Sequence, residues 1–317
     1  MRRIIVLDDE GLGNEPLGLE ALHSLGKVQQ YRSTLPEQVV RRIGDNEIVL
    51  TNKVAIDGAI MDACPKMRYI GVLSTRYDIV DIRAAAERGI FVTNIPAYST
   101  YAVVQHSLAL LLEVCNHVHL HHQAVKAGRW ERSRVYCFWD APLMELWGKT
   151  MGIYGLGRIG QGLARAAQAL GMQVLAHTRT PKNLPGIREV SLEELLSCSD
   201  VFSINCPLTA RTQGSIANMQ IAQMKQGAIL LNTASGKIVC QSDVLSALDA
   251  GKLAFYLADV MAQEPPESGD ALLHHPRSIF TPHLAWAPLE TRRRLASIAV
   301  SNVRAYLEGS VENQVTL

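Results

Sequence analysis

The most constraining feature of this 317-residue chain is a run of three glycines, Gly155, Gly157 and Gly160, in the pattern Gly-x-Gly-x-x-Gly. An apolar strand, 151–154, precedes the run, and an alanine-rich helix, 163–170, follows it. In such a strand–turn–helix unit the first glycine permits a tight turn, the second lets the backbone approach a pyrophosphate, and the third lets the helix pack closely on the strand. Free N–H groups at the start of the helix attract phosphate. The pattern therefore predicts a dinucleotide site.

The residues after the next strand, 173–176, bear on which dinucleotide binds. Sites for NAD usually carry an acidic residue there, which accepts hydrogen bonds from the adenosine ribose. This chain has Thr178, Arg179 and Thr180 instead. A guanidinium can pair with a 2′-phosphate, and the two hydroxyls can hydrogen-bond its oxygens. We expect NADP(H) to be preferred, with NAD(H) possible; the alternative is that Arg179 is a solvated loop residue.

Charge and composition exclude several classes of partner. The net charge is +1 and there is no basic run, so we expect no nucleic-acid partner. The apolar stretch 4–7 is too short for a signal peptide, and the longest apolar run elsewhere, 108–112, is too short to span a membrane. The six cysteines form no Cys-x-x-Cys pair. They are typical of reduced core residues in a cytoplasmic protein.

Short apolar runs bounded by turn residues alternate with helical segments along the whole chain. Continuous apolar strands separated by helices predict parallel sheets that are covered on both faces. We therefore expect an α/β fold of two doubly wound parallel-sheet (Rossmann-like) domains around an interdomain cleft. The expected strands lie at 3–7, 48–51, 69–73, 89–93, 150–154, 173–176, 201–204, 228–231 and 254–259, and the first domain's helices near 20–25 and at 79–88.

Two long helices set the domain boundaries. Ser99 and Thr100 form a good N-cap, and one apolar helix is expected from there to about residue 127, carrying the chain into the second domain. The amphipathic helix 290–308 is expected to pack back on the first domain. The prediction is a discontinuous, flavodoxin-like substrate-binding domain, 1–99 plus 287–317, and a dinucleotide-binding domain, 100–286.

Two features of the region after residue 116 need interpretation. The segment 128–148 holds three of the four tryptophans, which indicates an active-site cover or a subunit interface. A histidine run precedes it and could suggest a metal, but no cysteine or carboxylate completes a ligand set. We expect no metal site and a structural or surface role for the run, His117, His119, His121 and His122.

Further motifs resemble one family, the D-isomer-specific 2-hydroxyacid dehydrogenases, over essentially the whole chain. The stretch 137–143, together with Trp286, is most similar to the glycerate dehydrogenase and hydroxypyruvate reductase branch. The resemblance implies a homodimer that acts on a small molecule. The motifs are Thr281-Pro-His-Leu-Ala-Trp-Ala287, Asp259-Val-Met-Ala-Gln-Glu-Pro265, 224–234, 92–100 and Gln105-His106.

The resemblance also implies a catalytic pair. His283 would be the general acid that protonates a carbonyl oxygen as hydride arrives from the nicotinamide. Glu264 would accept a hydrogen bond from the other ring nitrogen, which fixes the tautomer of His283. Asp259 would contact the nicotinamide carboxamide. The full set of expected cofactor contacts is Gly155, Gly157, Arg158, Ile159, Gly160, Thr178, Arg179, Thr180, Cys206, Pro207, Thr212, Thr233, Ala234, Asp259 and His283.

Two positions depart from the family pattern. Ser235 stands where the family carries an arginine that polarises the substrate carbonyl, so a neutral donor replaces a charged fork. Arg76 stands where the family usually has a glycine, in a loop expected to bind substrate with Ser74 and Thr75. Either the cation has moved to Arg76, or Arg76 faces solvent and the site is weakened; a deliberate mutation at position 235 is the third possibility. Trp139 is also expected to contact the substrate.

The expected function is NAD(P)H-dependent reduction of a small 2-ketoacid, similar to hydroxypyruvate or glyoxylate, to the D-2-hydroxyacid. Because Ser235 replaces the arginine, we expect low or altered activity. The alternative is a non-catalytic, dinucleotide-gated binding or sensor protein on the same fold. His283 and Glu264 favour the enzyme, and the missing arginine favours the sensor.

Overall fold

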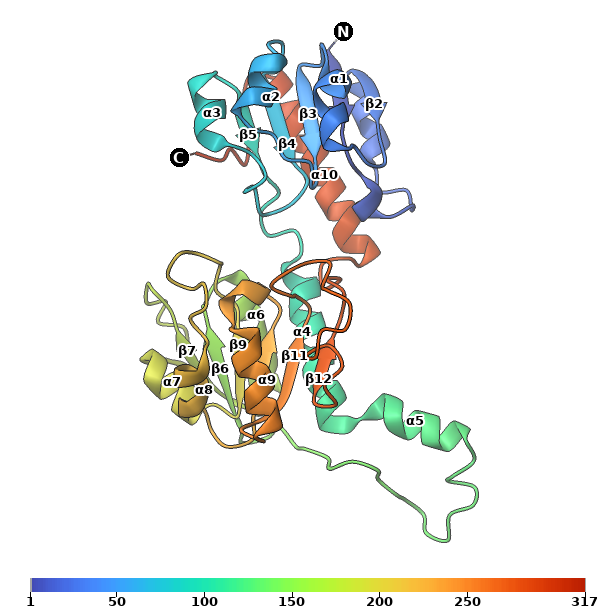
Figure 1. Cartoon of the computed structure of the whole chain (residues 1–317), viewed down its shortest axis with the longest axis vertical. Coiled ribbons are helices and arrows are strands. Elements are labelled where there is room, and N and C mark those ends of the chain that lie inside the picture. The colour runs from blue at the N-terminus through green and yellow to red at the C-terminus, as the bar shows by residue number, and fades with distance from the viewer. Residues whose placement is uncertain (1, 317) are drawn as a thin grey trace. The chain divides into compact units, whose positions relative to one another are not determined.

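The structure, a computed structural model, describes residues 2–316. The chain divides into two compact units, Met1–Ser99 with Ala287–Leu317, and Thr100–Trp286 (Figure 1). Each unit contains one sheet, and every pairing between its strands is parallel. The expected fold class, two doubly wound parallel sheets with helices on both faces, is confirmed.

The first unit has a five-stranded sheet in the order β2-β1-β3-β4-β5, the arrangement of flavodoxin-like folds. Its strands are β1 (Arg3–Val6), β2 (Lys27–Gln30), β3 (Ile48–Thr51), β4 (Tyr69–Val72) and β5 (Phe91–Thr93). Its helices are α1 (Val39–Ile43), α2 (Gly58–Ala63), α3 (Ile82–Glu87) and α10 (Leu289–Leu307), with 3₁₀ turns η1 (Glu10–Leu12), η2 (Leu19–Ser24) and η3 (Pro36–Gln38). The helix expected near 20–25 is thus a 3₁₀ helix.

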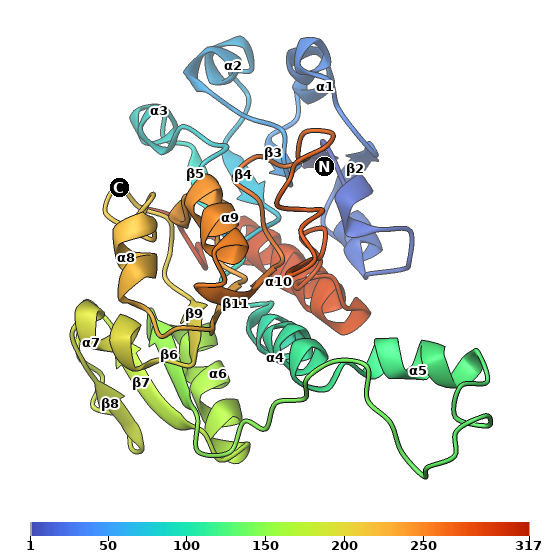
Figure 2. The same ribbon diagram turned by 60° about the horizontal axis from the view of Figure 1, so that its bottom comes forward.

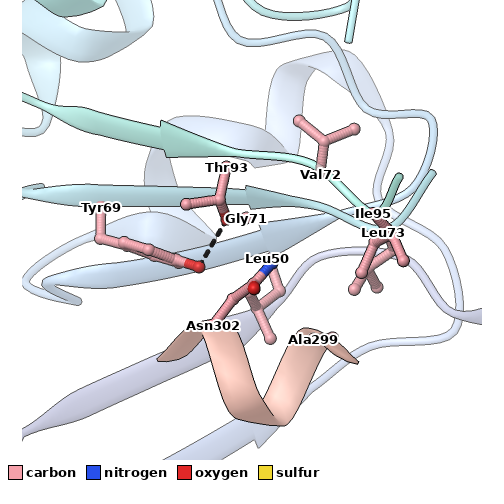
Figure 3. A pocket seen from close by; sticks show the side chains of 9 residues that line it. All are labelled: Leu50, Tyr69, Gly71, Val72, Leu73, Thr93, Ile95, Ala299 and Asn302. Carbon is pink, nitrogen blue, oxygen red and sulfur yellow. Dashed lines mark hydrogen bonds between the residues drawn. The ribbon is translucent and has the colours of Figure 1, made fainter. Parts of the chain in front are cut away.

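Helix α10 brings the last part of the chain onto this sheet. Its residues Ala299 and Asn302 lie against β4 and the ends of its neighbours (Figure 3). Gly71 in the middle of β4 leaves little room, because a Cβ there would lie 2.5 Å from Leu50 Cδ2. The Tyr69 hydroxyl, buried beside it, is 2.6 Å from Thr93 Oγ1. The opposite face of the sheet packs on α1, α2 and α3.

The second unit has a seven-stranded sheet in the order β12-β11-β10-β9-β6-β7-β8. Helices α4 and α6 pack on one face and α7, α8 and α9 on the other. The strands are β6 (Thr150–Tyr154), β7 (Gln173–His177), β8 (Ile187–Glu189), β9 (Val201–Ile204), β10 (Ala228–Asn232), β11 (Leu253–Ala258) and β12 (Ser278–Phe280). The helices are α4 (Thr100–Asn116), α5 (Val118–Lys126), α6 (Arg158–Ala169), α7 (Leu192–Cys198), α8 (Asn218–Gln223) and α9 (Gln241–Asp249), with the 3₁₀ turn η4 (Gly236–Ile238).

The single helix expected from residue 100 to about 127 was wrong, since it is two helices. His117 separates α4 from α5 and has φ 47°, in the left-handed region that ends a regular helix. Its carbonyl oxygen accepts hydrogen bonds from the backbone N–H of His121 and, at 2.8 Å, from Nδ1 of the same residue. The two histidines therefore stabilise the start of α5 after the break.

We predict that Gly152→Ala destabilises the second unit. Gly152 lies in β6, and a methyl group there would overlap the Ser199 hydroxyl, which donates a 2.5 Å hydrogen bond to the Leu195 carbonyl oxygen. Overpacking of this kind costs about 1–3 kcal/mol in the free energy of unfolding, measurable by urea denaturation. Adding Ser199→Gly should recover part of the loss. A Gly152→Ala protein as stable as the parent would contradict the prediction.

Candidate functional site

In the second unit, the expected cofactor and catalytic residues follow the carboxyl ends of the strands. Because all the strands are parallel, these ends lie at one edge of the sheet. The chain order reverses at β6, whose neighbours are β7 on one side and β9 on the other. Ligands of doubly wound sheets bind at such a switch point. The glycine turn follows β6, so the sequence motif stands at this point of the sheet.

The glycine turn has the geometry that a pyrophosphate needs. Gly155 has φ 104°, a conformation open to glycine but rarely to other residues. At Gly160 a side chain would collide with the Gly155 carbonyl oxygen. Gly157 is the N-cap of α6, with no side-chain cap and no atom within 4 Å of where a Cβ would stand. The start of α6 is therefore uncapped and open, which fits a phosphate-bearing cofactor.

The loop after β7 carries no acidic residue at the position that an adenosine ribose would meet. Arg179 and Thr180 are exposed and Thr178 is half-buried. The Thr178 hydroxyl donates to the Thr180 carbonyl oxygen at 3.3 Å, which rigidifies the turn. The side chain of Arg179 thus projects from a short, internally bonded turn.

The turn after β9 is closed by its own hydroxyls. Thr212 Oγ1 donates to the Pro207 carbonyl oxygen at 2.7 Å, so residues 207–212 form a compact loop. Cys206 is buried, and burial raises the pKa of its thiol to about 11. The thiol is therefore protonated at neutral pH and a poor nucleophile. Any contribution of Cys206 to a cofactor site is a matter of packing and backbone contacts.

Asn232, at the end of β10, holds the loop that contains Ser235. Its Nδ2 donates to the Ser235 carbonyl oxygen at 2.9 Å, and its Oδ1 accepts from the N–H groups of Ala234 and Ser235 at 3.1 and 3.3 Å. Thr233 Oγ1 is 3.0 Å from Ser107 Oγ on α4. Asn232 was not among the expected site residues, although a polar residue at the end of a fully buried strand is a signal for a functional or structural role.

His283 and Glu264 meet as the resemblance implied. His283 Nδ1 lies 2.7 Å from Glu264 Oε2, and the other carboxylate oxygen accepts from the Met261 N–H at 2.9 Å. With the carboxylate as acceptor, Nδ1 carries a proton and Nε2 is left for a ligand. The His283 side chain is 46% exposed, so the ring is accessible. Its backbone has φ 53°, which for a histidine needs support from the surroundings.

Asp259 supplies that support. Its side chain is 2% exposed, and its oxygens accept hydrogen bonds from Thr281 Oγ1 at 2.5 Å, from the Leu284 N–H at 2.9 Å and from the Ala285 N–H at 2.8 Å. These donors lie on both sides of His283 in the sequence. The expected contact of Asp259 with a nicotinamide carboxamide stays a prediction, and the contacts present make it an anchor of the loop.

The expected substrate-binding residues of the first unit are engaged within their own loop. Ser74 Oγ donates to the Arg76 carbonyl oxygen, and Thr75 Oγ1 donates to the Ile95 carbonyl oxygen at 2.8 Å. The Arg76 guanidinium forms a fork with Asp78, at 3.0 Å from Nε and 2.8 Å from Nη2. This hydrogen-bonded partner lowers the pKa of the Asp78 carboxyl. Arg76 is not among the described residues with positive φ, so the position does not require glycine.

Trp139 lies in the segment between α5 and β6, which stands away from the sheet of its own unit in both views (Figures 1 and 2). Its side chain is 65% exposed. Along this segment the Asp140 N–H donates to His121 Nε2 at 3.0 Å, and the Arg129 guanidinium lies over the Phe138 ring, 4.3 Å from its centroid. The expected contact of Trp139 with the substrate stays a prediction.

No three His, Cys, Asp or Glu side chains among the described residues gather as metal ligands would. Within the same residues, no helix is long and apolar enough to cross a membrane.

The glycine turn and the uncapped start of α6 fit a dinucleotide, and the His283–Glu264 pair fits an acid–base role. The family model "D-isomer specific 2-hydroxyacid dehydrogenase, NAD binding domain" matches residues 108–285. The chain belongs to the D-isomer-specific 2-hydroxyacid dehydrogenases, in the glycerate dehydrogenase and hydroxypyruvate reductase branch.

Relatives match over nearly their whole length. A hydroxypyruvate reductase of Blautia hydrogenotrophica is 45% identical over 319 residues, covering 99% of each chain. A glycerate dehydrogenase of Methylorubrum extorquens is 36% identical, again covering 99% of each. An NADPH-dependent glyoxylate/hydroxypyruvate reductase of Sinorhizobium meliloti, solved in complex with NADP and malonate, is 29% identical with a TM-score of 0.86 and covers 99% of this chain and 97% of its own.

Proposed function

We propose that the protein is an NADPH-preferring reductase that converts a small 2-ketoacid, such as hydroxypyruvate or glyoxylate, to the D-2-hydroxyacid. The observation that carries the proposal is the His283–Glu264 pair, 2.7 Å apart, at the same sheet edge as the open glycine turn. The names of the relatives support the substrate class. In this proposal residues 100–286 bind the cofactor, and residues 1–99 with 287–317 bind the substrate.

The cofactor would be held by the glycine turn, by the turns after β7 and β9 and by the loop after β10. When bound, the dihydronicotinamide supplies the hydride. His283, protonated on both nitrogens, gives its Nε2 proton to the oxygen of the substrate carbonyl and becomes neutral; its Nδ1 proton stays on the ring, hydrogen-bonded to Glu264. Glu264 stabilises the charged ring before the transfer and fixes its orientation, because its second oxygen is bound to the Met261 N–H.

Ser235 limits this chemistry. Ser235 is 8% exposed, and Asn232 holds its loop by a hydrogen bond to the Ser235 carbonyl oxygen. A hydroxyl there offers one neutral hydrogen bond to a ketoacid, where a guanidinium would offer two charged ones. The Arg76 guanidinium donates two hydrogen bonds to the Asp78 carboxylate. This favours the interpretation that the site is weakened over the one in which Arg76 replaces the missing arginine.

We expect Ser235→Arg to raise kcat/KM for glyoxylate and hydroxypyruvate about 10²-fold, because it restores a charged contact to the developing oxyanion. Arg76→Gly should change kcat/KM little, since Arg76 already pairs with Asp78. Steady-state oxidation of NADPH at 340 nm measures both. High parental activity that survives Arg76→Gly, or loss of turnover in Arg76→Gly, would contradict the argument. Tight NADPH binding without turnover of any ketoacid, even in Ser235→Arg, would instead support the binding or sensor protein.

We expect Arg179→Ala to weaken NADPH binding about 10- to 100-fold, the value of one charge-assisted contact to a phosphate. NADH, which has no 2′-phosphate, should bind as before. Titration calorimetry with both cofactors measures the two dissociation constants. The matched control is Arg188→Ala, an exposed arginine of β8 that pairs with Glu194. Equal losses for NADPH and NADH would remove the basis for NADP preference.

We also propose a cytoplasmic homodimer that uses the segment 118–148. Large apolar side chains are exposed along it, more than a solvated loop needs, and an isologous interface would bury them. Six free cysteines suit a reducing compartment. The exposed apolar residues of the segment are Val118, Leu120, Val125, Trp130, Val135, Tyr136, Trp139, Leu143 and Trp147.

Sedimentation velocity at micromolar concentration should show a dimer. The double variant Val118→Glu/Leu143→Glu should shift it toward monomer. In the dimer, each copy would bury two unpaired carboxylates against the two carboxylates of the other copy. Met219→Glu is the control and should leave the dimer intact, because Met219 is an exposed apolar residue on α8, outside the segment 118–148. A parental protein that sediments as a monomer would refute the proposal.

A further inference from the structure

A second histidine, His106, contacts the loop that carries His283. It lies on α4, and its Nε2 is 2.8 Å from Thr281 Oγ1 and 3.5 Å from Asp259 Oδ1. The side chain is 17% exposed. In the sequence, His106 stands out only as part of a family motif, and it has no part in the proton transfer from His283.

The chain of contacts continues from Thr281 to the buried carboxylate. Thr281 Oγ1 donates to Asp259 Oδ1 at 2.5 Å, and the same carboxylate accepts the N–H groups of Leu284 and Ala285. Asp259 thus binds the segment 281–285 at three points that flank His283. The His283 N–H donates to the Thr281 carbonyl oxygen at 2.9 Å, so Thr281 also contacts the catalytic residue directly through its backbone.

The count of protons fixes the direction of each hydrogen bond. A hydroxyl has one proton, and Thr281 uses it toward Asp259, so Thr281 Oγ1 accepts from His106. His106 must therefore carry a proton on Nε2. Without that donor, the Thr281 hydroxyl loses its buried partner on one side and can rotate away from Asp259.

The loop needs such support because His283 is held in the left-handed region, at φ 53°. A residue with a Cβ keeps that conformation only when its neighbours impose it. The distance of 2.7 Å between His283 Nδ1 and Glu264 Oε2 depends on the same backbone. A loop that relaxes by about 1 Å would displace the proton donor and can cost about 10²-fold in rate.

We propose that His106 is a positioning residue: through the Thr281 hydroxyl and the Asp259 carboxylate it holds the 281–285 segment so that His283 keeps its bond to Glu264. The inference rests on the proposed function, in which His283 is the proton donor. Helix α4 would then help to orient His283 through His106, and Thr281 would link the two histidines.

The test compares variants that remove or keep each donor. His106→Leu and Thr281→Val should each lower kcat by about 10- to 100-fold, while the KM for ketoacid and the Kd for NADPH change less than about threefold. Thr281→Ser, which keeps the hydroxyl, and His106→Gln, which keeps an N–H donor, should retain most of the rate. The double variant His106→Leu/Thr281→Val should be no slower than the slower single variant, since both break one chain of contacts.

A second readout does not depend on turnover. In protein labelled with ¹⁵N-histidine, the His106 imidazole should show the Nε2–H tautomer. His106→Leu should shift the His283 titration and weaken its Nδ1–H signal toward Glu264. His274→Leu, an exposed histidine of the same unit, is the matched control and should change neither kcat nor the His283 spectrum.

The outcomes separate the inference from the function on which it rests. If the parental protein reduces no ketoacid, the proposed function fails, and the His283 spectrum alone decides the positioning role. If His106→Leu keeps the parental kcat and the parental His283 titration, the inference is overturned. A loss in His106→Leu that His106→Gln does not recover, with Thr281→Val unaffected, also overturns it, because packing alone would then explain the effect.

Discussion

The direction of the strands is the constraint on which the second unit depends. Seven strands run parallel, so each delivers the loop that follows it to the same edge of the sheet. The glycine turn, the Asn232 loop, Asp259 and His283 are separated by up to 128 positions in sequence, yet all follow strand ends at that edge. Backbone hydrogen bonds of the sheet fix the strand ends, and buried polar side chains then fix the loops.

The sequence predicted the features that local residue patterns or family motifs determine. The run from Gly155 to Gly160 requires one backbone path, and both the positive φ at Gly155 and the crowding at Gly160 agree with it. The pairing of His283 with Glu264 was implied by the family motifs and is present at 2.7 Å. The parallel sheets followed from apolar runs too short for helices and too continuous for exposed strands.

What the sequence could not predict depends on particular side-chain contacts, some within one turn or loop and some between distant residues. The residue pattern does not show that His117 breaks the helix, although a hydrogen bond from His121, one turn later, supports its conformation. The fork between Arg76 and Asp78 depends on how a short loop folds, so sequence alone left the role of Arg76 open. Likewise, burial of Asp259 among three donors appears only once the loop after β12 is placed.

The position of α10 has a consequence for the order in which the chain can become structured. The sheet of the first unit is complete at β5, but one face of β4, with Tyr69 and Gly71, is covered by Ala299 and Asn302 (Figure 3). During synthesis these residues are made only after the whole second unit. The middle of the chain can thus complete its core while the first unit still exposes an apolar face, because the first unit's core cannot be finished until α10 has been made.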